Sequence, residues 1–324
     1  MNTPVLNVRD LVVEFKTEDG AVTAVNKVGI QLGQGEVLGL IGESGSGKSV
    51  TLRALLRLLP ERKSSISGIV EVDGRNVLEM SDKELRAYRG GETSMIFQEP
   101  ATAFDPVYTV GFQISESIRN HLGASRAEAR ARALELLKLV GIPSPETRLD
   151  NYPHEMSGGM RQRAMIALAL ASSPKLLLAD EPTTALDATV QIQVILLLRE
   201  LQRDLRMGVI FVTHDIGVAA EISDQVAVMY AGRIVENGKA RDVLKTPHHP
   251  YTEGLLSSTV HGAKKGETID AIPGMPPNLA DMPPGCAFAP RCRYATEICH
   301  QEKPELETGA NGRRVACFHA LEVA

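Results

Sequence analysis

The sequence has no long hydrophobic run, no cluster of basic residues and no signal-like amino terminus. Its richest apolar stretches, residues 164–171 and 192–198, fall short of the roughly 20 residues of a membrane helix, so we expect the chain not to span a bilayer. The net charge is −5, from 35 basic and 40 acidic residues, and the basic residues are dispersed, so we expect no nucleic-acid partner. Residues 1–4 lack the basic and apolar segments of a secretory signal.

Cysteine is absent before position 286, and all four cysteines lie in the final segment. They are Cys286, Cys292, Cys299 and Cys317. Because a cytosolic chain keeps its thiols reduced, this clustering favours a metal site over disulfides. The intervening lengths of five, six and seventeen residues differ from the Cys-x-x-Cys pairs of structural zinc sites. Four thiolates suffice for zinc or for a 4Fe–4S cluster, so the spacing leaves both open, and His300 or His319 could replace a thiolate on zinc.

Unliganded core thiols are the simpler interpretation of these cysteines. The surrounding segment is rich in proline and poor in regular apolar sequence, so we expect it to form little core of its own. A metal would then fold a segment that buries too little surface to fold alone.

The clearest motif is the glycine-rich stretch 42–49, GESGSGKS, between an apolar run and a helical pattern. That context predicts a phosphate-binding loop, because glycines let successive N–H groups face phosphate oxygens and the next helix adds its positive end. A flexible turn with a surface lysine is the alternative. The residues expected to contact the nucleotide are Gly42, Ser44, Gly45, Gly47, Lys48 and Ser49, with Lys48 on the β and γ phosphates and Ser49 on Mg²⁺.

Strands and helices alternate along most of the chain, which predicts an α/β fold with a largely parallel sheet. Strands are expected at 5–15, 21–32, 68–74, 95–98, 176–179, 209–213 and 226–230. Helices are expected after a capping box formed by Ser81 and Glu84, over 109–141, from 158, and over 191–205. We therefore expect a nucleotide-binding domain at 1–245, with a helical subdomain at about 105–165, and a small irregular segment at 246–324 that holds the cysteines.

Polar residues that follow strands extend the candidate site. Asp180 and Glu181 end a buried strand, where the aspartate can hold Mg²⁺ and the glutamate can deprotonate water, although a surface acidic pair is the plainer interpretation. His214 and Gln98 also follow strands, and a lone histidine is more often structural. The triplet 157–159, Ser-Gly-Gly, begins a helix and fits either an anion site or a helix cap.

In this order, the motifs resemble those of the ATP-binding-cassette (ABC) ATPases over about residues 5–243. The resemblance identifies 42–49 as Walker A, Gln98 as the Q-loop, Ser157, Gly158 and Gly159 as the signature, 176–181 as Walker B, 184–187 with Asp187 as the D-loop, His214 as the switch histidine and Phe15 as the adenine-stacking aromatic. Met160 stands where the commonest signature has glutamine. The resemblance implies that Glu181, His214 and Gln98 are catalytic, and that Ser49, Gln98 and Asp180 bind Mg²⁺. It also implies that two cassettes, head to tail, enclose two ATP molecules.

Residues 249–256 and the proline-rich, cysteine-containing tail are similar to the oligopeptide and dipeptide importer ATPases. This implies a second, identical or related cassette, two permeases, an extracytoplasmic peptide-binding protein, and a place on the cytoplasmic face of the inner membrane. It also favours 4Fe–4S over zinc, with Arg291, Arg293, Arg313 and Arg314 offsetting the cluster's charge. Some relatives import nickel, glutathione or other small solutes instead. A non-transport ABC ATPase would carry long coiled coils, zinc inserts or tandem cassettes, and none of these is seen in the sequence.

Overall fold

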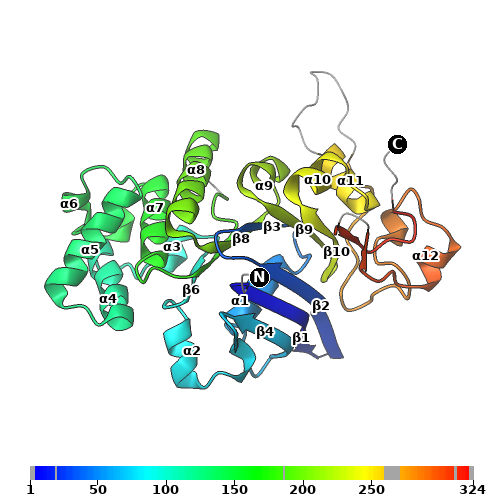
Figure 1. Ribbon diagram of the computed structural model, residues 1–324, viewed down its shortest axis with the longest axis horizontal. Coiled ribbons are helices and arrows are strands. Elements are labelled where there is room, and N and C mark those ends of the chain that lie inside the picture. The colour runs from blue at the N-terminus through cyan, green and yellow to red at the C-terminus, as the bar shows by residue number, and fades with distance from the viewer. Residues whose placement is uncertain (1–3, 19, 185–186, 259–270, 310–311, 321–324) are drawn as a thin grey trace. The chain divides into compact units, whose positions relative to one another are not determined.

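The computed structural model describes residues 4–18, 20–184, 187–258, 271–309 and 312–320 (Figure 1). The chain divides into two compact units. Unit 1 comprises residues 1–32, 36–78 and 211–324, and unit 2 comprises residues 33–35 and 79–210. The division falls within strand β8 (Gly208–Thr213).

Unit 1 contains an antiparallel sheet in the order β2-β1-β4-β5 and further strands in the order β11-β12-β10-β9-β3. The strands are β1 (Leu6–Thr17), β2 (Gly20–Leu32), β3 (Val37–Ile41), β4 (Ser64–Val72), β5 (Arg75–Asn76), β9 (Gln225–Tyr230), β10 (Arg233–Lys239), β11 (Glu307–Thr308) and β12 (Arg314–Val315). β3 and β9 pair in parallel, with Leu40 opposite Ala227. The expected strands at 5–15, 21–32 and 226–230 are confirmed, and β4 begins four residues earlier than the expected strand at 68–74.

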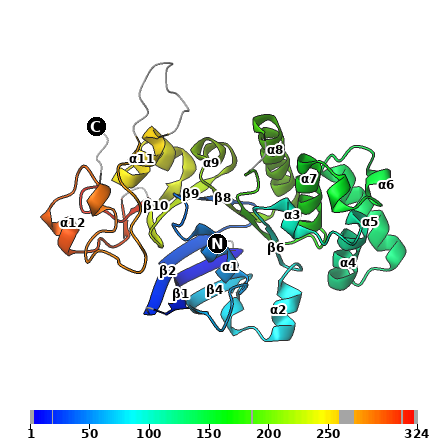
Figure 2. The same ribbon diagram turned by 180° about the vertical axis from the view of Figure 1, so that it is seen from behind.

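Unit 1 also contains several helices, some of which pack on these strands. They are α1 (Lys48–Leu55), α9 (Ile216–Ile222), α10 (Ala240–Lys245), α11 (Pro250–Ser257), α12 (Glu297–Gln301) and the 3₁₀ turn η3 (Ala289–Arg291), while the 3₁₀ turn η1 (Val77–Glu79) lies where the chain passes to unit 2. α1 contacts β1 and β2 (Figure 2), α9 contacts β3, and α10 contacts α9, α11 and β10. This packing holds the start of α1, and with it the glycine-rich loop, against a rigid base.

Unit 2 is mainly helical and contains the parallel pair β6 (Thr93–Ile96) and β7 (Leu176–Asp180). Its helices are α2 (Asp82–Tyr88), α3 (Pro100–Ala103), α4 (Val110–Leu122), α5 (Arg126–Leu139), α6 (Pro145–Arg148), α7 (Gly158–Ala169) and α8 (Ala188–Leu205), with a 3₁₀ turn η2 (Pro153–Glu155). β7 is buried throughout, as its uninterrupted apolar sequence predicts. Within the described ranges, no helix combines the length and apolarity that a membrane crossing requires. The expected α/β class is confirmed by these parallel pairs and their helices.

Capping residues and a glycine determine where several helices of unit 2 begin and end. The predicted capping box is present, since Ser81 Oγ accepts the Glu84 N–H at 3.5 Å and Glu84 Oε2 accepts the Ser81 N–H at 2.9 Å. The expected helical stretch at 109–141 is two helices, because Gly123 ends α4 in a left-handed conformation and Ser125 caps α5. α4, α5 and α7 contact one another and form the helical group seen in green in Figure 1.

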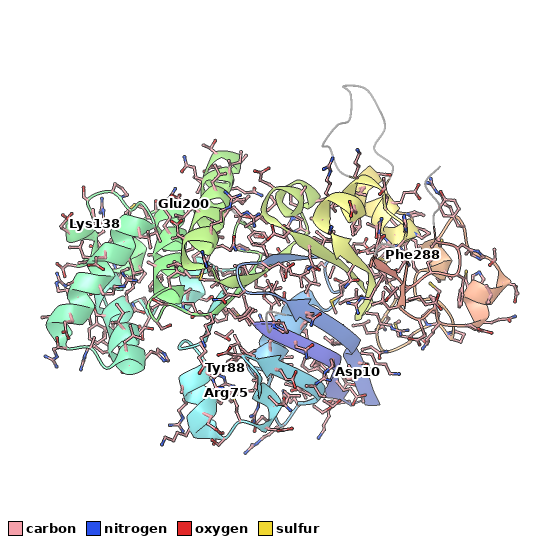
Figure 3. All side chains as sticks on the ribbon, in the orientation of Figure 1. Asp10, Arg75, Tyr88, Lys138, Glu200 and Phe288 are labelled. Atoms are coloured by element: carbon pink, nitrogen blue, oxygen red, sulfur yellow. The ribbon has the colours of Figure 1, made fainter. Side chains whose placement is uncertain are left out.

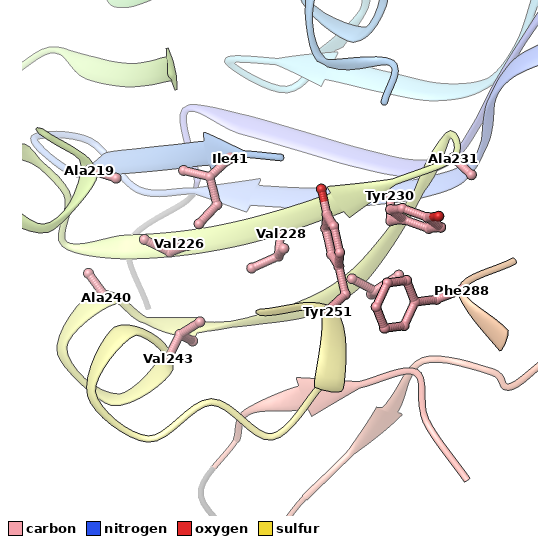
Figure 4. Close-up of a cluster of buried hydrophobic side chains, with 11 residues drawn as sticks. Ile41, Ala219, Val226, Val228, Tyr230, Ala231, Ala240, Val243, Tyr251 and Phe288 are labelled. Carbon is pink, nitrogen blue, oxygen red and sulfur yellow. The ribbon is translucent and has the colours of Figure 1, made fainter. Parts of the chain in front are cut away.

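The carboxyl-terminal segment contributes to a core that it shares with earlier parts of unit 1, which the sequence did not indicate. Tyr251 and Phe288 lie in a buried cluster with Tyr230 of β9 (Figure 4), with ring centroids 4.5 Å apart for the two tyrosines and 5.4 Å apart for Tyr251 and Phe288. Cys286 and Cys292 pack against the same cluster. The sequence hid this core because its members come from separate segments and share no helical or strand period.

We expect the substitution Phe288→Ala to lower the free energy of unfolding by about 3–5 kcal/mol, the usual cost of deleting a buried phenylalanine side chain. Phe288 contacts both tyrosine rings, at 5.3 Å from Tyr230 and 5.4 Å from Tyr251 between centroids. Chemical denaturation measures the effect. Met275→Ala is the matched control in the same segment, because Met275 is 87% exposed. Equal stability of the two variants would contradict a core role for Phe288.

Candidate functional site

The glycine-rich loop lies between β3 and α1 of unit 1, as the motif predicts. Gly47 is the N-cap of α1 with a left-handed φ of 105°, and the first turn of the helix contains no acidic residue. The first N–H groups of an α-helix have no intrahelical partner, so this end of α1 attracts anions. The loop and helix together form the type of backbone site that binds phosphate.

Two glycines of this loop occupy positions that a side chain would not fit. A Cβ on Gly42, which has a φ of 151°, would lie 2.2 Å from the Met229 carbonyl oxygen. A Cβ on Gly47 would lie 2.6 Å from the Ala24 carbonyl oxygen. Gly45 also has a positive φ, of 78°, but nothing lies within 4 Å of its Cβ position. Space therefore restricts Gly42 and Gly47, and backbone conformation alone restricts Gly45.

The ammonium group of Lys48 is held by the loop itself. Its Nζ donates to the carbonyl oxygens of Gly42 and Glu43, each at 2.8 Å, and to Ser46 Oγ at 3.4 Å. The lysine is 4% exposed, so these contacts lie in a weakly screened environment. Ser44 is exposed on the loop. The positive charge of Lys48, which the sequence predicts to bind the β and γ phosphates, therefore lies against the phosphate loop.

In unit 2, three polar side chains meet at the end of β7. The Gln98 amide Nε2 donates to Glu181 Oε2 at 3.3 Å, and the Thr184 hydroxyl donates to the same oxygen at 2.9 Å. Glu181 has a φ of 45°, a left-handed conformation that is rare outside glycine and is common at functional sites. Asp180 precedes it and is 2% exposed. The structure therefore brings together Gln98, Asp180 and Glu181. It also shows Thr184 as a hydrogen-bond donor to Glu181, which the sequence analysis did not predict.

His214 and Phe15 lie in unit 1. His214 directly follows β8 and is exposed, and the next residue, Asp215, caps α9 by accepting the Val218 N–H at 3.1 Å. Phe15 lies near the end of β1, half-buried, opposite Val22 of β2. Both side chains are thus accessible from the protein surface, and their contacts with a nucleotide stay predictions.

Two motif residues of unit 2 are helix caps. Ser157 Oγ accepts the Met160 N–H at 3.3 Å at the start of α7, and Asp187 Oδ1 accepts the Val190 N–H at 3.0 Å at the start of α8. Ser157 and Gly158 are exposed, and Gly159 is half-buried. The capping interpretation of Ser157 is confirmed, while its contact with ATP stays a prediction. Residues 185 and 186 of the predicted D-loop lie outside the described residues.

Sequence reasoning missed a connection between the glycine-rich loop and the carboxyl-terminal segment. Arg291 donates to both carboxylate oxygens of Glu43, at 2.7 and 2.9 Å, and the Tyr251 hydroxyl accepts the Glu43 N–H at 2.8 Å. The sequence suggested that Arg291 would offset the charge of a metal cluster. The structure places its charge on the phosphate loop instead. The only signal in the sequence was an acidic residue inside a loop predicted to bind anions. Such a carboxylate repels the anion unless a basic side chain neutralises it.

The four cysteines lie around one small pocket in unit 1. Its other walls are mainly aromatic, proline and alanine side chains, with His249 and His319 also present. Cys299 is buried, and the other three are partly buried. Burial raises the pKa of Cys286 and of Cys292, and raises the pKa of Cys317 to about 11.

The prediction of a 4Fe–4S cluster at Cys286, Cys292, Cys299 and Cys317 is wrong. Among the residues that the structure describes, no group of three or more His, Cys, Asp or Glu side chains is placed to hold a metal ion. The physical reason is the core described above. The segment is stabilised by aromatic packing, and Cys286 and Cys292 pack against that core. The interpretation as unliganded core thiols fits the structure.

A phosphate loop at the start of a helix and an acidic pair at the end of a buried strand define the protein as a P-loop nucleoside triphosphatase. Residues 25–184 match the family described as "ABC transporter", and residues 235–299 match "Oligopeptide/dipeptide transporter, C-terminal region". The chain belongs to the ABC transporter family. It is therefore an ATP-binding cassette with ATPase activity.

Similar proteins support this assignment over nearly the whole chain. A probable peptide ABC transporter ATP-binding protein of Sinorhizobium fredii is 49% identical over 98% of this chain and 96% of its own length. The oligopeptide transport ATP-binding protein OppD of Salmonella typhimurium is 50% identical over 98% of this chain and 94% of its own length. The solved dimeric structure of MJ0796, a bacterial ABC transporter cassette, is 29% identical, covers 73% of this chain and 99% of its own, and has a TM-score of 0.66.

Proposed function

We propose that this ATPase powers the import of di- or oligopeptides across the inner membrane. The observation that carries the proposal is the match of residues 235–299 to the oligopeptide/dipeptide transporter region, in a chain whose relatives are named for peptide, dipeptide and oligopeptide transport. A cassette alone does not select the solute, so another small solute, such as nickel or glutathione, is the alternative.

In the proposed mechanism, unit 1 holds the nucleotide. Lys48 and the N–H groups of the loop bind the β and γ phosphates, and Phe15 stacks on adenine. The buried position of Lys48 and its contacts with the loop carbonyls support this role. His214, exposed after β8, contacts the γ-phosphate.

Glu181 acts as the general base on the attacking water. Its Oε2 atom accepts hydrogen bonds from Gln98 and Thr184, which fix the direction of the carboxylate. Asp180, Gln98 and Ser49 are the proposed ligands of Mg²⁺, and their oxygen donors are the kind that this ion prefers. Bound Mg²⁺ would offset phosphate charge. Asp180 is 2% exposed, so the charge of its carboxylate is weakly screened by solvent, which suits a cation ligand.

A second cassette completes each ATP site in this proposal. Ser157, Gly158 and Gly159 would face the nucleotide held by the other cassette, with Asp187 beside them. The exposure of Ser157 and Gly158 at the start of α7 supports this arrangement, since a helix start that is accessible can meet an anion. The solved structure of MJ0796 is dimeric, and another structure of that cassette is bound to ADP and Pi. ATP would favour the closed pair more than ADP does, which shifts the equilibrium during each cycle.

Two permeases, an extracytoplasmic peptide-binding protein and a place on the cytoplasmic face of the inner membrane complete the proposed importer. Unit 2 offers a surface for the permeases. The rings of Tyr108 and Phe112 are exposed and stack with centroids 4.9 Å apart, and the neighbouring Val107 is 68% exposed. Exposed apolar groups that gather in this way mark interaction surfaces. The surface follows Gln98 in the chain, so permease contact and hydrolysis use neighbouring segments.

Uptake by the assembled transporter tests the proposed solute class. The cassette would be reconstituted in vesicles with the permeases and binding protein encoded beside it, and labelled dipeptide, oligopeptide, nickel and glutathione would be supplied in turn. We expect ATP-dependent accumulation of peptide. Accumulation of nickel or glutathione but not peptide would contradict the peptide assignment and leave the ATPase assignment intact.

We expect a thiol introduced by Phe112→Cys to form crosslinks with a permease in the assembled transporter. The native cysteines are partly or fully buried, and burial raises the pKa of three of them, so an exposed new thiol should react preferentially. Met275→Cys is the control, since Met275 is highly exposed in the carboxyl-terminal segment. Crosslinks from position 275 and none from position 112 would contradict the proposed docking surface.

A further inference from the structure

The side chain of Glu43 joins the phosphate loop to the carboxyl-terminal segment. Arg291 Nη1 donates to Glu43 Oε2 at 2.7 Å and Nη2 donates to Oε1 at 2.9 Å, which is a bidentate pair. The Arg291 side chain is 5% exposed. Its Nε donates to the Pro273 carbonyl oxygen at 2.9 Å, and its Nη1 also donates to the Tyr230 hydroxyl at 3.3 Å. The guanidinium group is therefore fixed by partners on several sides.

The backbone of Glu43 is held by a second residue of the segment. The Tyr251 hydroxyl accepts the Glu43 N–H at 2.8 Å, and the Tyr251 ring is fully buried among the aromatic residues of Figure 4. The N–H of Tyr251 donates to His249 Nδ1 at 3.0 Å. Burial lowers the pKa of His249 to about 4, so this ring is neutral near pH 7 and can accept the bond. Tyr251 is thus held at its backbone N–H by His249 and along its ring by the buried aromatic cluster.

Glu43 alone connects these contacts to Lys48, the lysine proposed to bind phosphate. The carbonyl oxygen of Glu43 accepts a hydrogen bond from Lys48 Nζ at 2.8 Å. Arg291 and Tyr251 hold the side chain and the N–H of the same residue. A shift of Glu43 would therefore move an acceptor of the Lys48 ammonium.

Arg291 also removes an electrostatic conflict. Glu43 places a carboxylate inside a loop that attracts phosphate, and like charges at short range in a partly buried site repel strongly. A guanidinium group at 2.7–2.9 Å neutralises that carboxylate, and its near-complete burial limits screening by salt. Arginine suits the task because its planar fork matches both carboxylate oxygens.

We propose that Arg291 and Tyr251 are positioning residues for ATP binding, which act through Glu43 to hold the phosphate loop in its binding conformation and to neutralise its one carboxylate. The carboxyl-terminal segment is then a working part of the nucleotide site. Its contribution is to the binding of the triphosphate, while the general base lies in unit 2.

Steady-state ATPase kinetics of the full chain test the proposal. Arg291→Met should raise the KM for ATP roughly 5- to 30-fold, because it leaves the Glu43 carboxylate unpaired beside the phosphates. Tyr251→Phe removes one hydroxyl and preserves the core, so it should raise KM by roughly 2- to 10-fold. The kcat should change far less than KM in both variants, which is the pattern of lost binding. Titration with a fluorescent ATP analogue should give the same ranking.

Two further variants separate charge from geometry. Arg291→Lys keeps the charge and loses the bidentate fork, so its KM should lie between those of the wild type and Arg291→Met. Combining Arg291→Met with Glu43→Gln should bring KM back toward the wild-type value, because the unpaired carboxylate is removed as well. Additive losses in that double variant would overturn the charge argument.

Arg313→Met is the control for a merely structural effect. Arg313 lies in the same segment, pairs with the buried Glu236 and donates to the Thr246 carbonyl oxygen at 2.6 Å, and neither partner belongs to the phosphate loop. This variant should lower the melting temperature and leave the KM for ATP unchanged. The proposal is overturned if Arg291→Met and Tyr251→Phe have wild-type KM values, or if Arg313→Met raises KM as much as Arg291→Met does.

Discussion

Replacing Glu181 by glutamine should slow ATP turnover by about 10²–10⁴-fold, the usual contribution of a general base. Glutamine keeps the size of the side chain and removes its basicity. The oxygen that accepts from Gln98 and Thr184 can be kept by the amide, so the loop geometry should survive. The phosphate-loop residues proposed to hold the nucleotide lie in unit 1 and are unchanged in this variant, so binding should persist and the ATP-bound cassette dimer should accumulate. Single-turnover hydrolysis and size-exclusion chromatography with ATP measure these effects.

The matched control for this variant is Glu200→Gln. Glu200 is an exposed glutamate on α8 of unit 2 and is labelled in Figure 3. The same change of chemistry there should leave turnover at the wild-type rate. If Glu181→Gln also hydrolyses ATP near the wild-type rate, Glu181 is not the base.

Gly42→Ala should weaken ATP binding by about 10²-fold, because a displaced loop loses hydrogen bonds to the charged phosphates that are worth about 1.5–3 kcal/mol each. The new Cβ would lie 2.2 Å from the Met229 carbonyl oxygen, so the backbone must move. The positive φ of 151° adds strain for any residue with a side chain. Moving Gly42 also moves a carbonyl that accepts from Lys48 Nζ at 2.8 Å. Equilibrium binding of a fluorescent ATP analogue measures the loss.

Gly45→Ala separates the clash from the conformational strain. Gly45 lies in the same loop, also has a positive φ, and has no atom within 4 Å of its Cβ position. It should therefore lose much less affinity than Gly42→Ala. Equal losses at the two positions would show that strain, and not the Met229 contact, controls the loop.

The part of the site that the sequence predicted consists of residues that are neighbours in the chain. The loop 42–49 and its helix are local, so a spacing rule describes them, and the capping residues Ser81 and Ser157 follow from equally local chemistry. The meeting of Gln98 with Glu181 depends on β6 and β7 being parallel neighbours. From the sequence, the contact between Gln98 and Glu181 could be expected only because the order of the motifs resembles that of a known family.

The remaining contacts could not be predicted, because they join distant segments. Glu43 and Arg291 are 248 residues apart, and no local pattern relates them. The error at the cysteines has the same origin. Spacing in a proline-rich segment gives no information on which faces turn inward, so the apolar residues that pack there, such as Phe288, were not recognised as a core.

The ion pair between Glu43 and Arg291 restricts which segments of related proteins can be combined in a functional hybrid. A hybrid that joins the first 245 residues of one relative to the tail of another would have to match an acidic loop residue with a basic tail residue. A tail lacking that arginine would leave Glu43 without a counter-ion, and a loop lacking the glutamate would leave a guanidinium group that is only 5% exposed without its carboxylate. Loop and tail are therefore expected to change together during divergence.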